Sequence, residues 1–287
     1  MNGEVRWRLD FGRDLSERLA RFQQPGGIRA SAIGGSVARG LSDVYSDLEL
    51  ILLWEKAPDP PTRQEIMTAL GAEYRLPAAD PGHDSSLAVQ GIPVDLWHLT
   101  IAVEEATLRQ VLDEYSLDLV ASNRLDTFRN CIPLFGHDLL NEWKARIEQY
   151  PDELTIRFLR TYLPHFHLRQ LNLVARRDNP TAYFHTLTDI QCSLYLILLA
   201  LNHVYFPTFK WMYPIMETFA VSPKNLTARL RRMFEVPPLE AAGQLQTLLA
   251  ETLAIMEEHY PQIDTAFARY SLDQAPQIFS APPSPNP

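Results

Sequence analysis

Two carboxylates separated by one residue, Asp47 and Glu49, stand at the start of an apolar run that ends at Trp54. Alternate side chains of a β-strand point to the same face, so we expect Asp47 and Glu49 to share a face. Leu48 and Leu50 then point the other way, into the core. Two carboxylates on one face can hold a divalent metal ion, and Mg²⁺ prefers a few carboxylates together with substrate phosphates. Alone, such a pair is more typical of a solvated strand edge, so metal-assisted phosphoryl or nucleotidyl transfer is indicated only together with the segment upstream.

A candidate phosphate-binding turn, Gly34-Gly35-Ser36, lies a short distance upstream of these carboxylates. Glycine tolerates positive φ and allows backbone N–H groups to come close to an anion. The turn follows an apolar run, 30–33, that we expect to be a buried strand, and it leads into a helical turn over 37–41. A phosphate cradle between two strands, one of which begins with the carboxylates, is the arrangement that nucleotidyl transfer needs.

A third carboxylate, Asp95, lies in a later and mostly apolar strand, 92–100, which Gly91 joins to a preceding strand over 86–90. Burying an unpaired carboxylate is costly, so we expect Asp95 to face a metal or a partner. The alternative is a salt-bridged or turn-proximal residue. His98 falls on the opposite face of this strand, where a packed or surface histidine is expected rather than a metal ligand.

These segments resemble the nucleotidyltransferase superfamily that includes DNA polymerase beta and the aminoglycoside nucleotidyltransferases. The family pattern is Gly-Gly/Ser-Ser, a spacer, and then Ser-Asp-hydrophobic-Asp/Glu-hydrophobic. Here it is matched by Gly35-Ser36 and by the run from Ser46 to Leu50. Glu49 departs from the many members that carry Asp, although the kanamycin-type antibiotic enzymes also have Asp-hydrophobic-Glu.

The resemblance implies a catalytic, metal-binding triad of Asp47, Glu49 and Asp95, with two Mg²⁺ ions expected and ATP or another NTP as the donor. The residues that it places at the nucleotide in the first half of the chain are Gly35, Ser36, Arg39 and Ser46. A glutamate near the domain interface is the general base of the kanamycin-type enzymes, and Glu104 and Glu105 are both candidates here.

The segment 201–211 resembles the helical domain of an uncharacterised bacterial nucleotidyltransferase group, in which Leu-Asn-x-x-Tyr and a hydrophobic-Pro pair precede Lys-Trp. In related antibiotic enzymes a Lys and a Tyr of the helical domain contact the nucleotide phosphates. Tyr205 and Lys210 are the matching candidates. The alternative is that Tyr205 belongs to the core and Lys210 to the surface.

The chain as a whole predicts an α+β protein with two domains and a tail. Residues 1–137 are expected to form a polymerase beta-like nucleotidyltransferase domain, a mixed sheet with helices. Residues 138–272 should form an all-α helical bundle, because the run 194–201 is apolar nearly all round, as in a central helix. The Pro-rich segment 273–287 is expected to be disordered.

Composition limits the cellular compartments and the kinds of partner that we expect for this protein. A hydrophobic content of 46% indicates a globular protein, and a net charge of −9 argues against a broad grip on nucleic acid. No uncharged apolar run is long enough to cross a bilayer, and the charged N-terminus is not a signal peptide. Cys131 and Cys192 are expected to be free thiols in a reducing cytosol. We expect a cytoplasmic protein without a membrane partner, and the oligomeric state stays open.

The expected activity is Mg²⁺-dependent transfer of a nucleoside monophosphate, AMP from ATP in the first instance, to a hydroxyl of a small acceptor such as an antibiotic. This expectation comes from the resemblance and from the acidic charge. Two alternatives remain open. One is nucleotidylation of a protein or tRNA, and the other is a non-catalytic nucleotide-binding module.

Overall fold

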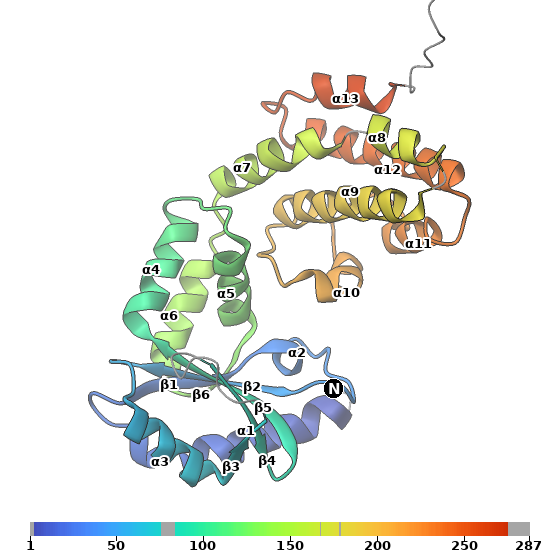
Figure 1. Cartoon of the computed structure of the whole chain (residues 1–287). Coiled ribbons are helices and arrows are strands. Elements are labelled where there is room, and N and C mark those ends of the chain that lie inside the picture. The colour runs from blue at the N-terminus through green and yellow to red at the C-terminus, as the bar shows by residue number, and fades with distance from the viewer. Residues whose placement is uncertain (1–2, 76–83, 167, 178, 275–287) are drawn as a thin grey trace, which may run out of the picture. The chain divides into compact units, whose positions relative to one another are not determined.

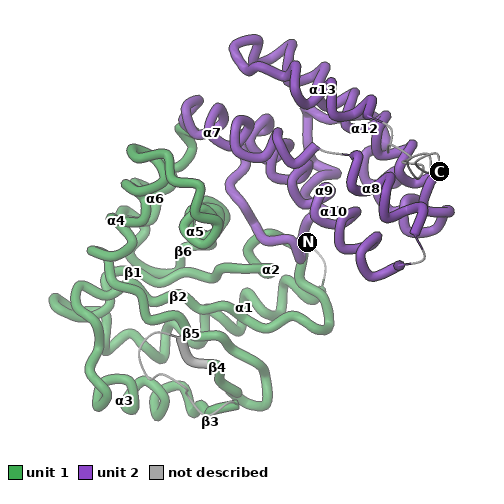
Figure 2. The backbone as a smooth tube through the Cα atoms, turned by 45° about the horizontal axis from the view of Figure 1, so that its top comes forward, with its two compact units in different colours: residues 1–150 green, residues 151–287 purple. Residues whose placement is uncertain are grey.

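The computed structural model describes residues 3–75, 84–166, 168–177 and 179–274. It divides into two compact units, residues 1–150 and 151–287 (Figure 2). The first contains a mixed sheet with helices, and the second is mainly helical, so the predicted α+β class is confirmed. The predicted disordered tail lies, from residue 275 onward, outside the described residues.

The first unit is built on a six-stranded sheet with the order β3-β4-β5-β2-β1-β6. Of the strand pairs that the structure describes, β2 and β5 run parallel and the others antiparallel. The strands are β1 (Ile28–Ile33), β2 (Leu48–Trp54), β3 (Ala72–Tyr74), β4 (Asp84–Val89), β5 (Ile92–Thr100) and β6 (Ile132–Phe135). The predicted strands over 48–54 and 92–100 are confirmed with the same bounds.

Helices lie on both sides of this sheet (Figure 1). Below it in that view are α1 (Gly3–Arg18) and α3 (Pro60–Leu70), and above it stand α4 (Ile101–Leu112), α5 (Leu119–Asn130) and α6 (His137–Ile147). A short 3₁₀ turn, Ala20–Phe22, follows α1, and the four-residue α2 (Gly35–Ala38) follows β1.

The main core of the first unit lies between the sheet and helices α1 and α3. Leu48, Leu50 and Leu52 of β2 contribute one row of buried side chains, and Val94 and Leu96 of β5 contribute the next. These residues alternate with the carboxylates along the strands, as the period of two requires. The core face therefore fixes the register that places Glu49 and Asp95 on the opposite face.

The first unit extends one helix further than the sequence suggested. The domain boundary was expected between 137 and 138, whereas the compact units divide after Tyr150. Helix α6 is amphipathic and buries Leu140, Trp143 and Ile147. It packs on α5 and on strands β1 and β6, so it belongs with the sheet. From the sequence, the apolar stripe of α6 indicates that the helix is buried, but it does not indicate which unit the helix packs against.

The second unit surrounds one apolar helix, α9 (Pro180–Leu201). Length and composition alone would let α9 cross a membrane, but 67% of its most apolar stretch is buried, as in the core helix of a bundle. The other helices are α7 (Asp152–Tyr162), α8 (Leu168–Val174), α10 (Met212–Met216), α11 (Leu226–Arg232), α12 (Pro238–His259) and α13 (Ala266–Leu272), with 3₁₀ turns at Leu163–His165 and Phe209–Trp211. The turn that contains Pro164 separates α7 from α8.

Candidate functional site

The parallel pairing of β2 and β5 brings the predicted carboxylates to one end of β2. Glu49 is the register partner of Asp95, and on the other side of β5 the partner of Asp95 is Ser86. The side chains of Asp47 and Ser86 both hydrogen bond to the Asp95 carboxyl. Two of the three predicted metal ligands, Asp47 and Asp95, are therefore side by side.

The surroundings of Asp95 raise the pKa of its carboxyl group. Burial is the largest cause, followed by the negative charge of Asp47. The hydrogen bond from Ser86 and the charge of Arg75 act in the opposite direction. Two neighbouring carboxylates that both ionise repel each other, so this pair favours either a shared proton or a bound cation.

A tight glycine turn packs against the third carboxylate, Glu49. Gly35 has φ +58°, in the left-handed region. A Cβ atom added to Gly35 would lie 2.2 Å from Cδ and Oε2 of Glu49, so the Glu49 carboxylate would have to move to admit a side chain at this position. Gly34 also accommodates Thr127 of α5, whose Cγ2 would lie 3.3 Å from an added Cβ. The predicted turn therefore exists: its left-handed backbone and the contact with Glu49 favour glycine at position 35, and position 34 is tightly packed.

The three carboxylates suit a hard divalent cation by chemistry and by register. They provide only oxygen donors, and the Asp47–Asp95 pair holds like charges together. Within the described parts of the chain, however, no three His, Cys, Asp or Glu side chains are already grouped as a metal site. Glu49 is the member that differs, because its carboxylate lies against Gly35.

Arg39, predicted to contact the nucleotide, is buried and bound to Asp126 of α5. Its Nε donates to Asp126 Oδ2 at 2.9 Å, and its Nη2 donates to the same oxygen. The two side chains are only 7% and 5% exposed. Burial raises the pKa of Asp126, and the Arg39 guanidinium opposes that rise. In this structure Arg39 therefore fastens the glycine turn to α5.

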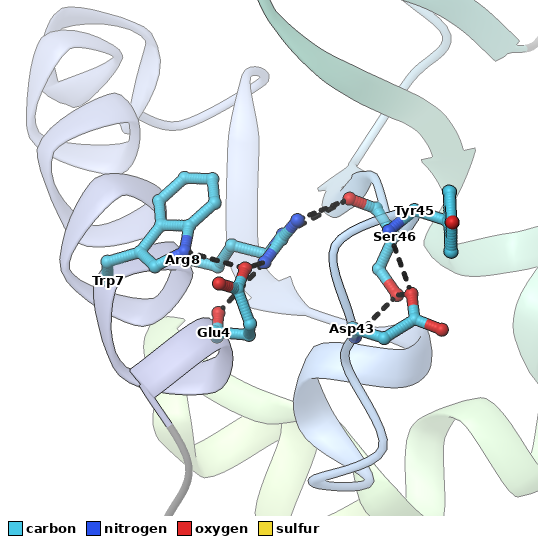
Figure 3. Close-up of polar contacts among 6 residues, drawn as sticks. All are labelled: Glu4, Trp7, Arg8, Asp43, Tyr45 and Ser46. Atoms are coloured by element: carbon cyan, nitrogen blue, oxygen red, sulfur yellow. Dashed lines mark hydrogen bonds and ion pairs between the residues drawn. The ribbon is translucent and has the colours of Figure 1, made fainter.

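Ser46, also predicted at the nucleotide, takes part in a closed turn just before Asp47 (Figure 3). Its hydroxyl donates to Asp43 Oδ1 at 2.8 Å and accepts from the Asp43 N–H at 3.0 Å. Its carbonyl oxygen accepts two hydrogen bonds from Arg8 of α1. Ser36 of the glycine turn is likewise buried, at 6% exposure.

The two candidate general bases both contact neighbouring helices. Glu105 accepts hydrogen bonds from Trp143 Nε1 at 2.5 Å and from Arg146 Nη1 at 2.8 Å. Glu104 is 3% exposed, and its Oε2 lies 3.5 Å from Arg124 Nε. Both carboxylates thus have structural partners, and the geometry selects neither as a base.

Tyr205 and Lys210 belong to the helical unit and differ in exposure. Tyr205 is buried, at 1% exposure, as a core residue. Lys210 is exposed, and its Nζ lies 5.1 Å from the centroid of the Trp211 ring. A phosphate contact by Lys210 stays a prediction, whereas Tyr205 has little surface to offer a ligand in this structure.

The opposite end of β2 is distinct from the carboxylate end. A cavity of about 540 Å³ opens there, with Trp54, Arg21 and Lys56 in its lining. It is separated from Asp47 by the length of β2, roughly 20 Å for a strand of this size. His98 packs beside Trp54, and burial, with a smaller effect of Arg63, lowers its pKa to about 3. This cavity is therefore not part of the carboxylate site.

Comparison with known families gives a partial match. Residues 122–212 match a family described as Domain of unknown function (DUF4037). The matched segment begins within α5, includes Asp126, and ends just beyond Lys210, so it contains residues of both units. No curated protein matches the chain.

Proposed function

We propose that this chain is a Mg²⁺-dependent nucleotidyltransferase that moves a nucleoside monophosphate to a hydroxyl of a small acceptor. AMP from ATP is the first choice of donor. The observation that carries the proposal is the contact between Asp47 and Asp95, with Glu49 as the register partner of Asp95 and the glycine turn packed on Glu49. The family resemblance of this segment supports the same assignment.

The three carboxylates would hold the metal, with Asp47 and Asp95 as the pair already assembled. When bound, Mg²⁺ would offset the negative charge of the nucleotide phosphates. Backbone N–H groups in the first turn of a helix lack intrahelical acceptors, so those of Gly35 and Ser36 are the proposed phosphate contacts. The acceptor hydroxyl attacks the α-phosphorus, a new P–O bond forms, and pyrophosphate leaves while a base takes the hydroxyl proton.

Several predicted residues take a different part in this proposal. Arg39 and Ser46 are engaged inside the protein, so they would position the turn and the start of β2 rather than bind nucleotide. Lys210 is the remaining candidate for a phosphate contact from the helical unit. A small acceptor fits the net charge of −9, and the free thiols of Cys131 and Cys192 fit the proposed cytoplasmic location. Transfer to a protein or tRNA remains the alternative reaction.

The experiment is a calorimetric titration with a nonhydrolysable ATP analogue, with and without Mg²⁺. We expect Mg²⁺-dependent binding by the wild type and its loss in Asp47→Asn. Asp10→Asn, an exposed carboxylate on α1, is the matched control and should bind like the wild type. No Mg²⁺-dependent binding at about 1 mM nucleotide, the upper end of ordinary substrate affinities, would contradict the proposal.

A non-catalytic nucleotide-binding module is the second candidate. It is favoured by one observation: among the residues that the structure describes, no three His, Cys, Asp or Glu side chains are grouped as a metal site, although the catalytic proposal uses three carboxylates. Pyrophosphate release over a panel of small hydroxylated acceptors separates the two. Release with any acceptor supports transfer, and binding without release supports the module. Mass spectrometry for AMP added to a protein or tRNA tests the macromolecular acceptors.

A further inference from the structure

A buried arginine of α1 holds the turn that leads into β2. Arg8 is 4% exposed, and its Nε and Nη2 donate to the carbonyl oxygen of Ser46 at 3.2 and 2.8 Å. Its Nη1 donates to Glu4 Oε2 at 2.6 Å and to the Glu4 carbonyl oxygen at 3.1 Å. Trp7 covers the guanidinium, whose Cζ lies 4.2 Å from the ring centroid. The position of this guanidinium is therefore fixed from the α1 side.

The turn that Arg8 holds is itself closed by hydrogen bonds (Figure 3). The Ser46 hydroxyl donates to the Asp43 carboxylate and accepts from the Asp43 N–H, and the Tyr45 N–H donates to Asp43 Oδ1 at 3.0 Å. The Ser46 N–H also donates to the Asp43 carbonyl oxygen at 3.2 Å. The tip of the turn faces solvent, with Tyr45 92% exposed. Arg8 thus supports the inner side of a turn whose outer side has no cover in the described structure.

The residue after this turn is Asp47, whose side chain hydrogen bonds to Asp95. The Ser46 carbonyl belongs to the peptide unit that joins Ser46 to Asp47. Because a peptide unit is planar and rigid, fixing that carbonyl also fixes the direction in which Asp47 leaves the turn. Arg8 therefore holds the peptide unit that precedes Asp47, although it lies 38 residues away from Ser46 in the chain.

We propose that Arg8 is a positioning residue for Asp47: it holds the Ser46 carbonyl so that the Asp47 carboxylate meets the metal and the nucleotide. This inference rests on the proposed function for its effect on catalysis. Arginine suits the role because its planar fork places two donors on one acceptor while a third reaches Glu4. Lysine has a single nitrogen and can replace only part of this contact.

The test compares Arg8→Gln, Arg8→Lys and Glu4→Gln with Arg13→Gln, which removes an exposed arginine from the same helix. The first readout is Mg²⁺-dependent binding of the nonhydrolysable ATP analogue. The second is hydrogen exchange of the backbone amides in residues 43–48, which requires no ligand. Loss of a group that orients a metal ligand typically lowers metal affinity by about 10- to 100-fold. We expect Arg8→Gln to weaken Mg²⁺-dependent binding at least about tenfold and to speed exchange, with Arg8→Lys intermediate.

The outcomes separate this proposal from the proposed function. Arg8→Gln with wild-type binding and exchange would overturn the positioning role and leave the function intact. If the wild type itself does not bind nucleotide, the function fails and exchange in residues 43–48 decides the positioning role alone. Faster exchange confined to this turn supports the role, and unchanged exchange overturns it. Should Arg8→Gln not fold, Glu4→Gln, which leaves Arg8 in place but removes one of its acceptors, provides the same readouts with a smaller expected effect.

Discussion

The two ends of β2 lie beside titratable groups whose surroundings favour the neutral form, but the neighbouring charges have opposite signs. At the start of the strand, Asp95 has its pKa raised by burial and then by the neighbouring charge of Asp47. Near its end, His98 has its pKa lowered to about 3 by burial and then by Arg63. A bound cation would offset the repulsion between the carboxylates, whereas the positive charge of Arg63 would repel a cation near His98. The negative sign of the neighbouring charges is thus the feature that distinguishes the candidate ligand site from the surroundings of His98.

The largest expected effect on stability is at the buried ion pair between Arg39 and Asp126. Asp126→Ala should lower the free energy of unfolding by about 3–5 kcal/mol, because it leaves the Arg39 guanidinium buried without its partner. Asp10→Ala removes one member of the exposed Asp10–Arg13 pair and should cost less than about 1 kcal/mol. Urea denaturation of both variants measures the contrast. Equal losses would show that the buried pair is not needed to hold the turn.

A second substitution tests the close packing of the glycine turn. Gly35→Ala should destabilise the protein by about 3 kcal/mol, because it combines a left-handed backbone with a clash against Glu49. Gly40→Ala is the matched control, with φ +73° but nothing within 4 Å of an added Cβ. It should cost only about 1–2 kcal/mol.

Calorimetry on the same two variants sharpens this comparison. Gly35→Ala should also lose Mg²⁺-dependent nucleotide binding, since Glu49 must move to admit the methyl group. Gly40→Ala should retain it. Equal binding by both variants would show that the contact between Gly35 and Glu49 does not matter to the ligand.

His98, beside the opposite end of β2, should make the stability of the protein depend on pH. His98 has a folded-state pKa of about 3, below the value of 6.5 in an unfolded chain, so the unfolded state binds its proton first. Its contribution to stability is full above pH 6.5 and is lost as the pH falls toward 3. From about pH 7 to about pH 5 this loss amounts to about 2 kcal/mol.

The variant His98→Phe should remove this component of the acid sensitivity. His137→Gln, an exposed histidine, should leave it unchanged. Urea denaturation at the two pH values gives the difference. If the stability of His98→Phe depends on pH as strongly as that of the wild type, another group causes the acid sensitivity.

The smallest effect is expected at the turn before Asp47. Ser46→Ala removes the hydroxyl bond to Asp43 and should cost about 1 kcal/mol of unfolding free energy. The Arg8 bonds to the Ser46 carbonyl remain, so nucleotide binding should fall less than in Arg8→Gln. A larger loss in Ser46→Ala would indicate that the hydroxyl contacts the nucleotide directly, as the sequence suggested.

The sequence predicted best what depends on local pattern. The apolar runs predicted the bounds of β2 and β5, and the family resemblance grouped Asp95 with Glu49, its register partner in the structure. The sequence could not show partners that are distant in the chain. Asp126 lies 87 residues from Arg39, and Arg8 lies 38 from Ser46. The motif resemblance therefore predicts that Arg39 and Ser46 contact the nucleotide, whereas in the structure both side chains hydrogen bond to other residues of the protein.

The helical unit shows the same limit. Tyr205 and Lys210 stand five positions apart in one motif, yet one is buried and the other exposed. The motif alone left both possibilities open for each residue. The sequence did predict the central helix α9 of this unit, because a helix that is apolar nearly all round must be buried among other helices.

The parallel pairing of β2 with β5 has a consequence for folding. The two strands are joined through α3, β3 and β4, so they meet only after a long loop has closed, and such non-local pairings form slowly. Asp95 thus reaches Asp47 only when most of the sheet exists. A ligand that requires both carboxylates cannot be held by a partly folded chain. Its binding would therefore stabilise the sheet unit as a whole, and the thermal midpoint should rise with ligand concentration.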